Sequence, residues 1–96
     1  MDRQRTVWTV RRVDDRAYEL EVDGQIVGTA TIQERDGVVV IPHTEIDPSR
    51  RGEGWGTEFV RAVLDDLDAR GQRVVPQCPF VARFVEMHPE YGPMVA

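Results

Sequence analysis

The chain has 96 residues, with 12 basic and 17 acidic side chains and a formal net charge of −5 at pH 7. A chain of this length, residues 1–96, is expected to form one small domain that buries about 60–65% of the surface exposed when it is unfolded. The acidic balance disfavours a general nucleic-acid-binding protein, because phosphate backbones reward a basic surface. Every basic residue is arginine, which excludes mechanisms that need a lysine Schiff base or a Walker lysine.

The cysteine content and the apolar pattern predict a cytoplasmic protein. The chain has one cysteine, Cys78, and so can form neither an internal disulfide nor a multi-cysteine zinc site. No apolar run approaches about 18 residues, and the first ten residues lack a signal-peptide core, so we expect neither membrane insertion nor export.

The first half of the chain has the pattern of antiparallel strands. Alternating apolar and polar residues lie on both sides of Asp23 and Gly24, a dipeptide that is the strongest short hairpin signal. A second turn at residues 35–37 leads into a β-branched strand over residues 38–46. Pro42 in this strand predicts a bulge or a missing ladder hydrogen bond.

The second half of the chain is predicted to be mainly helical. Apolar residues recur at helical spacing from Trp55 to Leu67, and Gly71 follows as the expected C-cap. The short strand "RVVPQC" comes next, and a strand, helix, strand passage of this length normally makes the two strands parallel. A second helix begins at Pro79 and stops before Pro89. Its expected inward stripe is Phe80, Val81, Phe84 and Val85.

These elements predict an α/β (α+β) fold, in which helices cover a mixed antiparallel and parallel sheet. The segment from Thr6 to Val10 has two readings, a short edge strand or a loose arm.

The stretch "RRGEGWG", residues 50–56, places three alternating glycines behind two arginines and before a helix. Glycine is suited to such a place where the backbone takes a positive φ or is closely approached. A helix N-terminus offers backbone N–H groups to a phosphate, and Arg50 and Arg51 add permanent charge. The spacing is neither the dinucleotide fingerprint nor the P-loop. Two interpretations remain open here, an anion cradle and a tight turn beside solvated arginines.

Three motifs in order carry a family resemblance. "RRGEGWG" is similar to the R/Q-x-x-G-x-G/A acyl-CoA loop of the GNAT acyltransferase superfamily through Arg51, Gly54 and Gly56. With "VVPQCPFV" and "HPEY", the chain resembles the small single-domain YjdJ-type N-acetyltransferase-like proteins over about residues 18–91.

The resemblance implies a truncated GNAT core that moves an acetyl group from acetyl-CoA to a primary amine, without a metal. The amine-bearing acceptor, a small molecule or a protein, is not identified, and neither a nucleic acid nor a membrane is expected as partner. Coenzyme A would lie between the strand 38–46 and "RVVPQC", with its pyrophosphate on the backbone N–H groups of residues 51–56. The implied cofactor-binding residues are Ile46, Arg50, Arg51, Gly52, Glu53, Gly54, Trp55 and Gly56.

His43 and Cys78 are the candidate catalytic residues. Regular strand alternation puts His43 on one face with Glu45, and parallel strands present ligands at their carboxyl ends. Cys78 directly precedes a helix, a position that favours a thiolate. The two side chains are expected to face one site. Their structural alternatives are a satisfied strand histidine and a small buried hydrophobic residue.

A non-catalytic acyl-CoA-binding or regulatory module is the alternative function. Many larger GNAT enzymes carry an asparagine at the end of the strand that Cys78 ends here, and a general-acid tyrosine where this chain has Phe84 and Val85. Tyr91 is a possible replacement for that tyrosine.

Overall fold

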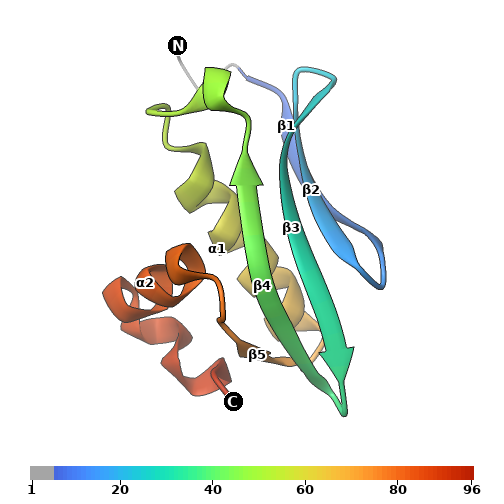
Figure 1. Cartoon of the computed structure of the whole chain (residues 1–96), viewed down its shortest axis with the longest axis vertical. Coiled ribbons are helices and arrows are strands. Elements are labelled where there is room, and N and C mark those ends of the chain that lie inside the picture. Colours follow the sequence, from blue (N-terminus) through green and yellow to red (C-terminus); the bar gives the residue numbers. More distant parts are fainter. Residues whose placement is uncertain (1–5) are drawn as a thin grey trace.

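The computed structural model describes residues 6–96, in which α-helices pack on one side of a five-stranded sheet (Figure 1). The strands lie in the order β1-β2-β3-β4-β5; the first four are antiparallel, and β5 is parallel to β4. The α+β class and the mixed sheet predicted from the sequence are therefore confirmed. The elements are β1 (Trp8–Asp14), β2 (Ala17–Val22), β3 (Gln25–Arg35), β4 (Val38–Ile46), η2 (Pro48–Arg50), α1 (Trp55–Ala69), β5 (Arg73–Val75), α2 (Pro79–Met87) and η3 (Pro89–Met94).

The hairpin turns form where the sequence predicts them. Asp23 and Gly24 both have positive φ, 49° and 83°, as a two-residue hairpin turn requires, and Asp36 and Gly37 repeat this geometry. The amino-terminal segment is an edge strand, longer than the sequence indicated, because β1 pairs with β2 from Trp8 to Asp14.

Helix α1 joins β4 to β5 and covers the sheet. Its buried stripe includes Phe59, Val63 and Leu67, which pack in the core. The helix ends at Ala69, Gly71 just beyond it has a φ of 70°, and Gln72 donates its N–H to the carbonyl of Leu67 at 3.0 Å. This is the glycine-terminated helix end that the sequence predicts.

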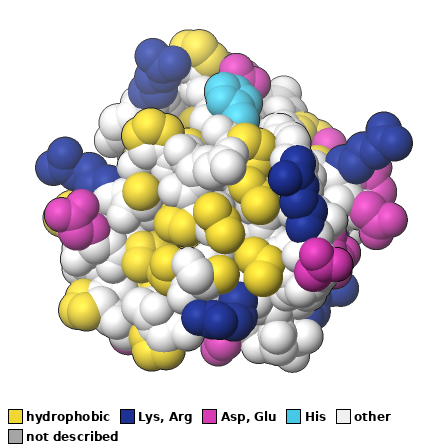
Figure 2. All heavy atoms as spheres, turned by 60° about the horizontal axis from the view of Figure 1, so that its bottom comes forward, with side chains coloured by type: hydrophobic (Ala, Val, Ile, Leu, Met, Phe, Trp, Pro, Cys, Tyr) yellow, Lys and Arg dark blue, Asp and Glu magenta, His cyan; other side chains and the backbone are white. Residues whose placement is uncertain are grey.

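The end of the molecule that carries β5 and the C-terminus has a mixed surface. Figure 2 shows hydrophobic side chains in the middle of this face, with charged side chains mostly around its rim. None of the helices within residues 6–96 is long and apolar enough to cross a membrane.

Candidate functional site

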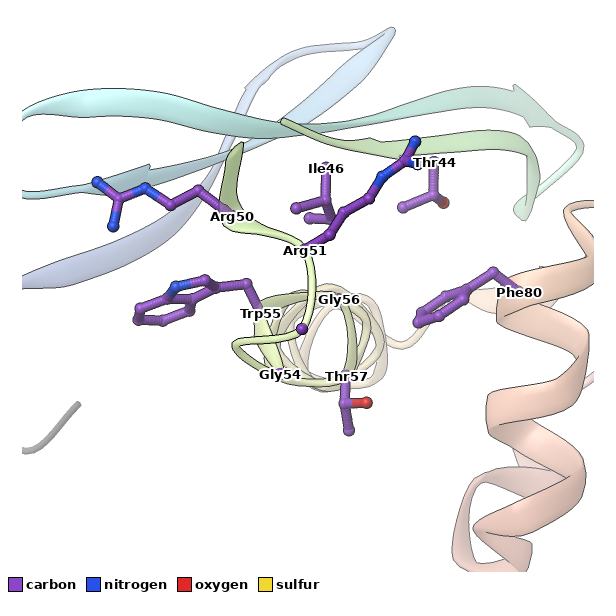
Figure 3. A pocket seen from close by; sticks show the side chains of 10 residues that line it. Thr44, Ile46, Arg50, Arg51, Gly54, Trp55, Gly56, Thr57 and Phe80 are labelled. Carbon is purple, nitrogen blue, oxygen red and sulfur yellow. The ribbon is translucent and has the colours of Figure 1, made fainter. Parts of the chain in front are cut away.

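A cavity of about 550 Å³ lies between β4, the start of α1 and the first turn of α2 (Figure 3). Strand β4 contributes Thr44 and Ile46, and α2 contributes Phe80. The rest of the lining comes from residues 50–57, with Glu53 the one exception in that range. Of the implied cofactor-binding residues, all but Glu53 therefore line this cavity.

The cavity opens where β4 has no neighbouring strand on one side. Strand β5 pairs with β4 only over Val38–Val40. Cys78 then donates its N–H to the carbonyl of Ile41 at 2.8 Å, and α2 begins at the next residue. Beyond Ile41, no strand among residues 6–96 pairs with this edge of β4.

The backbone of β4 offers hydrogen-bonding groups along that edge. On the other side of the strand, the N–H of Asp47 donates to the carbonyl of Val27 at 2.7 Å. Because successive residues of an antiparallel strand direct their backbone groups to opposite sides, those of Thr44 and Ile46 are directed toward the unpaired edge. This edge can pair with an extended ligand.

A β-bulge lies in β4, as Pro42 predicts. Thr31 pairs with His43 and Gln33 pairs with Val40, so β4 has one more residue than β3 between these two pairs. A bulge of this kind bends the strand and shifts the alternation of its side chains.

The shift decides which side chains of β4 face the cavity. Val39 and Ile41 are buried in the core beneath the helices. Regular alternation would continue on that side with His43, but after the bulge Thr44 and Ile46 take this position. His43 is consequently on the opposite face of the sheet.

The loop between β4 and α1 has the backbone geometry expected of an anion cradle. Gly52 and Gly54 have φ values of 84° and 85°, a left-handed conformation that favours glycine. The first helical hydrogen bond runs from the N–H of Glu58 to the carbonyl of Gly54, at 3.3 Å. The amides of Gly56 and Thr57 therefore have no acceptor within the helix, and they lie beside the cavity.

The two arginines of the loop have different surroundings. The side chain of Arg51 is exposed and extends along the β4 side of the cavity toward Thr44, whereas Arg50 points the other way (Figure 3). Arg50 approaches Glu53, with 3.6 Å between Nη1 and Oε1. The same Glu53 oxygen accepts a hydrogen bond from Nε1 of Trp55 at 2.9 Å, so this carboxylate braces the loop from behind.

Phe80 is the main correction to the predicted helix stripe. Val81 and Phe84 are buried as expected, but Phe80 is 46% exposed and forms a wall of the cavity. The sequence analysis also missed Thr44 and Thr57 as lining residues. The three alternating glycines were a signal that some group approaches the backbone closely. That group is the ring of Phe80, which lies where a Cβ atom at Gly56 would meet it.

The structure does not bring the side chains of His43 and Cys78 together. The His43 side chain is 61% exposed, and its Nε2 lies 3.4 Å from Oε1 of Glu45. Cys78 is 5% exposed and belongs to the apolar core. Neither lines the cavity, and their catalytic roles stay predictions.

Tyr91 is also held outside the cavity. Its hydroxyl donates to Oδ1 of Asp65 on α1 at 2.7 Å, and its ring contacts Phe84. Burial and the bond to Asp65 raise the pKa of Tyr91. Tyr91 is therefore not placed to act as an acid in the cavity.

Two known proteins that resemble this chain, one in sequence and one in fold, are named as N-acetyltransferases. An uncharacterized N-acetyltransferase of Methanocaldococcus jannaschii is 30% identical over 76 residues, and the match covers 71% of this chain and 33% of that relative. The ribosomal-protein-S18-alanine N-acetyltransferase of Escherichia coli has a similar fold, with a TM-score of 0.62 and 17% identity over 77% of this chain and 52% of its own. The chain thus spans a third of the first protein and about half of the second. Residues 17–94 match the family described as GCN5-related N-acetyl-transferase. The chain therefore belongs to the GCN5-related N-acetyltransferase family.

Proposed function

We propose that the cavity binds acetyl-coenzyme A and that the protein transfers the acetyl group to a primary amine. The observation that carries this proposal is the unpaired edge of β4, which meets the glycine loop at the start of α1. An elongated ligand with a phosphate group at one end and amides along its length has a partner for each part in this arrangement.

The phosphate end of the ligand is assigned to the loop. The left-handed backbone at Gly52 and Gly54 and the amides of Gly56 and Thr57 supply donors at a helix N-terminus, where anions bind well. Among residues 6–96, Arg51 forms no ion pair, and its guanidinium is available to a phosphate. In this proposal, Glu53 contributes its backbone and supports the loop rather than touching the ligand.

The thioester-bearing arm is assigned to β4. Amide groups of the pantetheine can pair with the backbone of Thr44 and Ile46 as an added strand would. Phe80 closes the other side of the cavity. An extended, oriented arm reduces the entropic barrier to the attack on the thioester.

The acceptor amine is assigned to the opposite face of the sheet. An unpaired edge can be reached from both faces, and His43 and Glu45 lie on the face away from the cavity. The amine nitrogen would attack the thioester carbonyl, the new C–N bond would form as the C–S bond breaks, and His43 would accept the proton of the amine. The departing thiolate would take a proton from solvent or from the acceptor side.

A non-catalytic acyl-CoA-binding module is the second candidate. It is favoured by the composition of the cavity wall, in which Arg50 and Arg51 carry the only ionisable side chains contributed by residues 6–96. The burial of Cys78 and the engagement of Tyr91 with Asp65 fit the same candidate.

Titration calorimetry with coenzyme A at low salt tests the binding step. The wild type should bind, and Arg51→Ala should bind at least about tenfold more weakly, a loss of about 1.4 kcal/mol. Arg35→Ala, at the far end of β3, is the matched control and should leave the affinity unchanged. A larger loss for coenzyme A than for dephospho-coenzyme A assigns Arg51 to the 3′-phosphate, and equal losses assign it to the pyrophosphate. A folded wild type that binds no coenzyme A overturns the proposal.

Release of free thiol from acetyl-CoA in the presence of amines separates the two candidates. An amine-dependent release, with an acetylated product of matching mass, supports the transferase. Binding without release for any amine or peptide of a broad panel supports the non-catalytic module.

A further inference from the structure

Thr44 carries a buried hydroxyl without a hydrogen-bond partner in the protein. The Oγ1 atom is buried from solvent, and it forms no hydrogen bond with any atom of residues 6–96. Leaving a hydroxyl in this state costs free energy, because the group has lost water and gained nothing. Such a group in a native structure calls for an explanation, and its position suggests one.

The side chain of Thr44 separates two spaces. On one side is the cavity assigned to acyl-coenzyme A, and on the other is a small void without room for a water molecule. The other residues around that void are apolar and include Ile41, Phe59, Val60 and Val81. In Figure 3 the Thr44 hydroxyl is on the side turned toward Phe80, and its methyl group is on the side of Ile46.

One step between staggered rotamers about the Cα–Cβ bond would bring the methyl group to the present position of the hydroxyl and would move the hydroxyl to the position that the hydrogen now occupies. Threonine side chains have staggered rotamers related by 120°, so the change requires no movement of the backbone. The methyl group would then be next to the apolar void, where it is better suited than a hydroxyl. The hydroxyl would leave its present buried position, on a residue that lines the cavity.

We propose that the Thr44 hydroxyl donates a hydrogen bond to a carbonyl oxygen on the thioester-bearing arm of bound acyl-coenzyme A, after this rotation. The inference rests on the proposed function and extends it, because it identifies a side chain that distinguishes the arm from the nucleotide. The free protein holds the hydroxyl at a cost, and the ligand relieves that cost. Thr44 is therefore a binding residue whose partner is the ligand.

The test compares Thr44→Val with the wild type in two measurements. Valine has nearly the same shape and no hydroxyl, so the melting temperature of the free protein should rise, by about 4–8 °C per kcal/mol for a domain of this size. The affinity for coenzyme A or acetyl-CoA, measured by calorimetry, should fall by about tenfold. The affinity for 3′-phosphoadenosine 5′-diphosphate, which has no arm, should not change.

Two control variants complete the experiment. Thr44→Ser retains the hydroxyl and should retain the affinity. Thr31→Val replaces a threonine on the opposite face of the sheet, beside His43, and should leave the affinity unchanged.

The outcomes separate this inference from the proposed function. Weaker binding of acetyl-CoA alone assigns the bond to the thioester carbonyl, and weaker binding of both ligands assigns it to an amide carbonyl of the arm; either supports the inference. An unchanged affinity for both, a lower melting temperature of Thr44→Val, or an equal loss for the ligand without the arm overturns it while the proposed function stands. A wild type that binds no coenzyme A overturns both.

Discussion

A Cβ atom added at Gly56 would lie 2.9 Å from Cζ of Phe80, a distance that real Cβ atoms essentially never show. Gly56 is in the first turn of α1 and Phe80 is in the first turn of α2, and both residues line the cavity. The ring of Phe80 can therefore occupy its position in the cavity wall because Gly56 has no side chain.

Gly56→Ala should separate ligand binding from stability. Alanine is favoured over glycine in a helix by up to about 1 kcal/mol, and the ring of Phe80 is partly exposed and can move. We expect an unchanged or slightly higher melting temperature and an affinity for coenzyme A that is about threefold to tenfold lower, measured by calorimetry. In the Phe80→Ala background the same substitution should have a smaller effect on affinity. Equal effects in both backgrounds would contradict a role for this contact.

Gly52→Ala provides a comparison with a different cause. The Cβ atom would meet nothing within 4 Å, but Gly52 has a φ of 84°. The cost, about 1–3 kcal/mol, should therefore be seen in the free energy of unfolding, because the backbone is strained without a clash.

Local signals predicted much of the fold. The turn at Asp23 and Gly24, the helix end at Gly71 and the bulge at Pro42 each follow from the backbone preference of one or two residues. The glycine loop was predicted for the same reason, since left-handed backbone and a helix N-terminus are properties of a short segment.

The side of the sheet or helix on which each site residue lies could not be predicted from such local signals. One extra residue in β4 reverses the alternation, so His43 is on the face opposite Thr44. The exposure of Phe80 depends on how α2 crosses α1, a tertiary relationship with no signature in its own segment. Helical periodicity identified the apolar face of α2. It could not indicate that Phe80, on that face, lies beyond the edge of the core.

Glu53 should act on the loop through position and charge, which two substitutions can separate. Glu53→Ala removes the acceptor of the Trp55 Nε1–H bond and the partner of Arg50, so we expect a stability loss of about 1 kcal/mol and weaker binding of coenzyme A. Glu53→Gln retains an acceptor for the indole and removes a negative charge near the phosphate site. It should bind coenzyme A as tightly as the wild type or more tightly. If Glu53→Gln loses as much affinity as Glu53→Ala, the carboxylate charge matters and the bracing role is wrong.

Tyr18 and Asp66 should make stability depend on pH. The buried Tyr18 hydroxyl donates to Oδ2 of Asp66, which also accepts from Nε of Arg70 at 2.8 Å. Burial, followed by the bond to Asp66, raises the pKa of Tyr18 to about 12. Burial alone would raise the pKa of Asp66, but the hydrogen bonds from Tyr18 and Arg70 outweigh it, and the pKa of Asp66 is lowered.

The signs of these shifts define the pH window. A raised tyrosine pKa adds stability that is complete below about pH 10 and is lost as the pH rises toward 12. A lowered aspartate pKa adds stability that is complete above about pH 4 and is lost as the pH falls further.

Tyr18→Phe should therefore lower the free energy of unfolding, measured in urea, by about 1.5–3 kcal/mol between about pH 5 and 9, and by less outside that range. Tyr91→Phe, with its exposed Asp65 partner, is the control and should cost less. A Tyr18→Phe penalty independent of pH would assign it to packing alone.

The burial of Cys78 favours one of two routes for the proposed acetyl transfer. A thiol that attacks the thioester must reach the carbonyl carbon, but Cys78 is 5% exposed, is packed in the core and does not line the cavity. His43 is exposed on the face assigned to the amine, where it can accept a proton without rearrangement of the core. We therefore expect direct attack by the amine, which needs only an oriented nucleophile and a base.

Incubation with acetyl-CoA and no acceptor should leave the mass of the protein unchanged, and Cys78→Ala should retain substantial transfer. His43→Ala should lower kcat by about 10²-fold or more at neutral pH and flatten the acidic limb of the pH–rate profile, whereas loss of a merely structural histidine would leave the profile's shape intact. An acetyl group traced to Cys78 that is then chased onto an amine would establish the covalent route instead, and it would require that α2 move to expose the thiol.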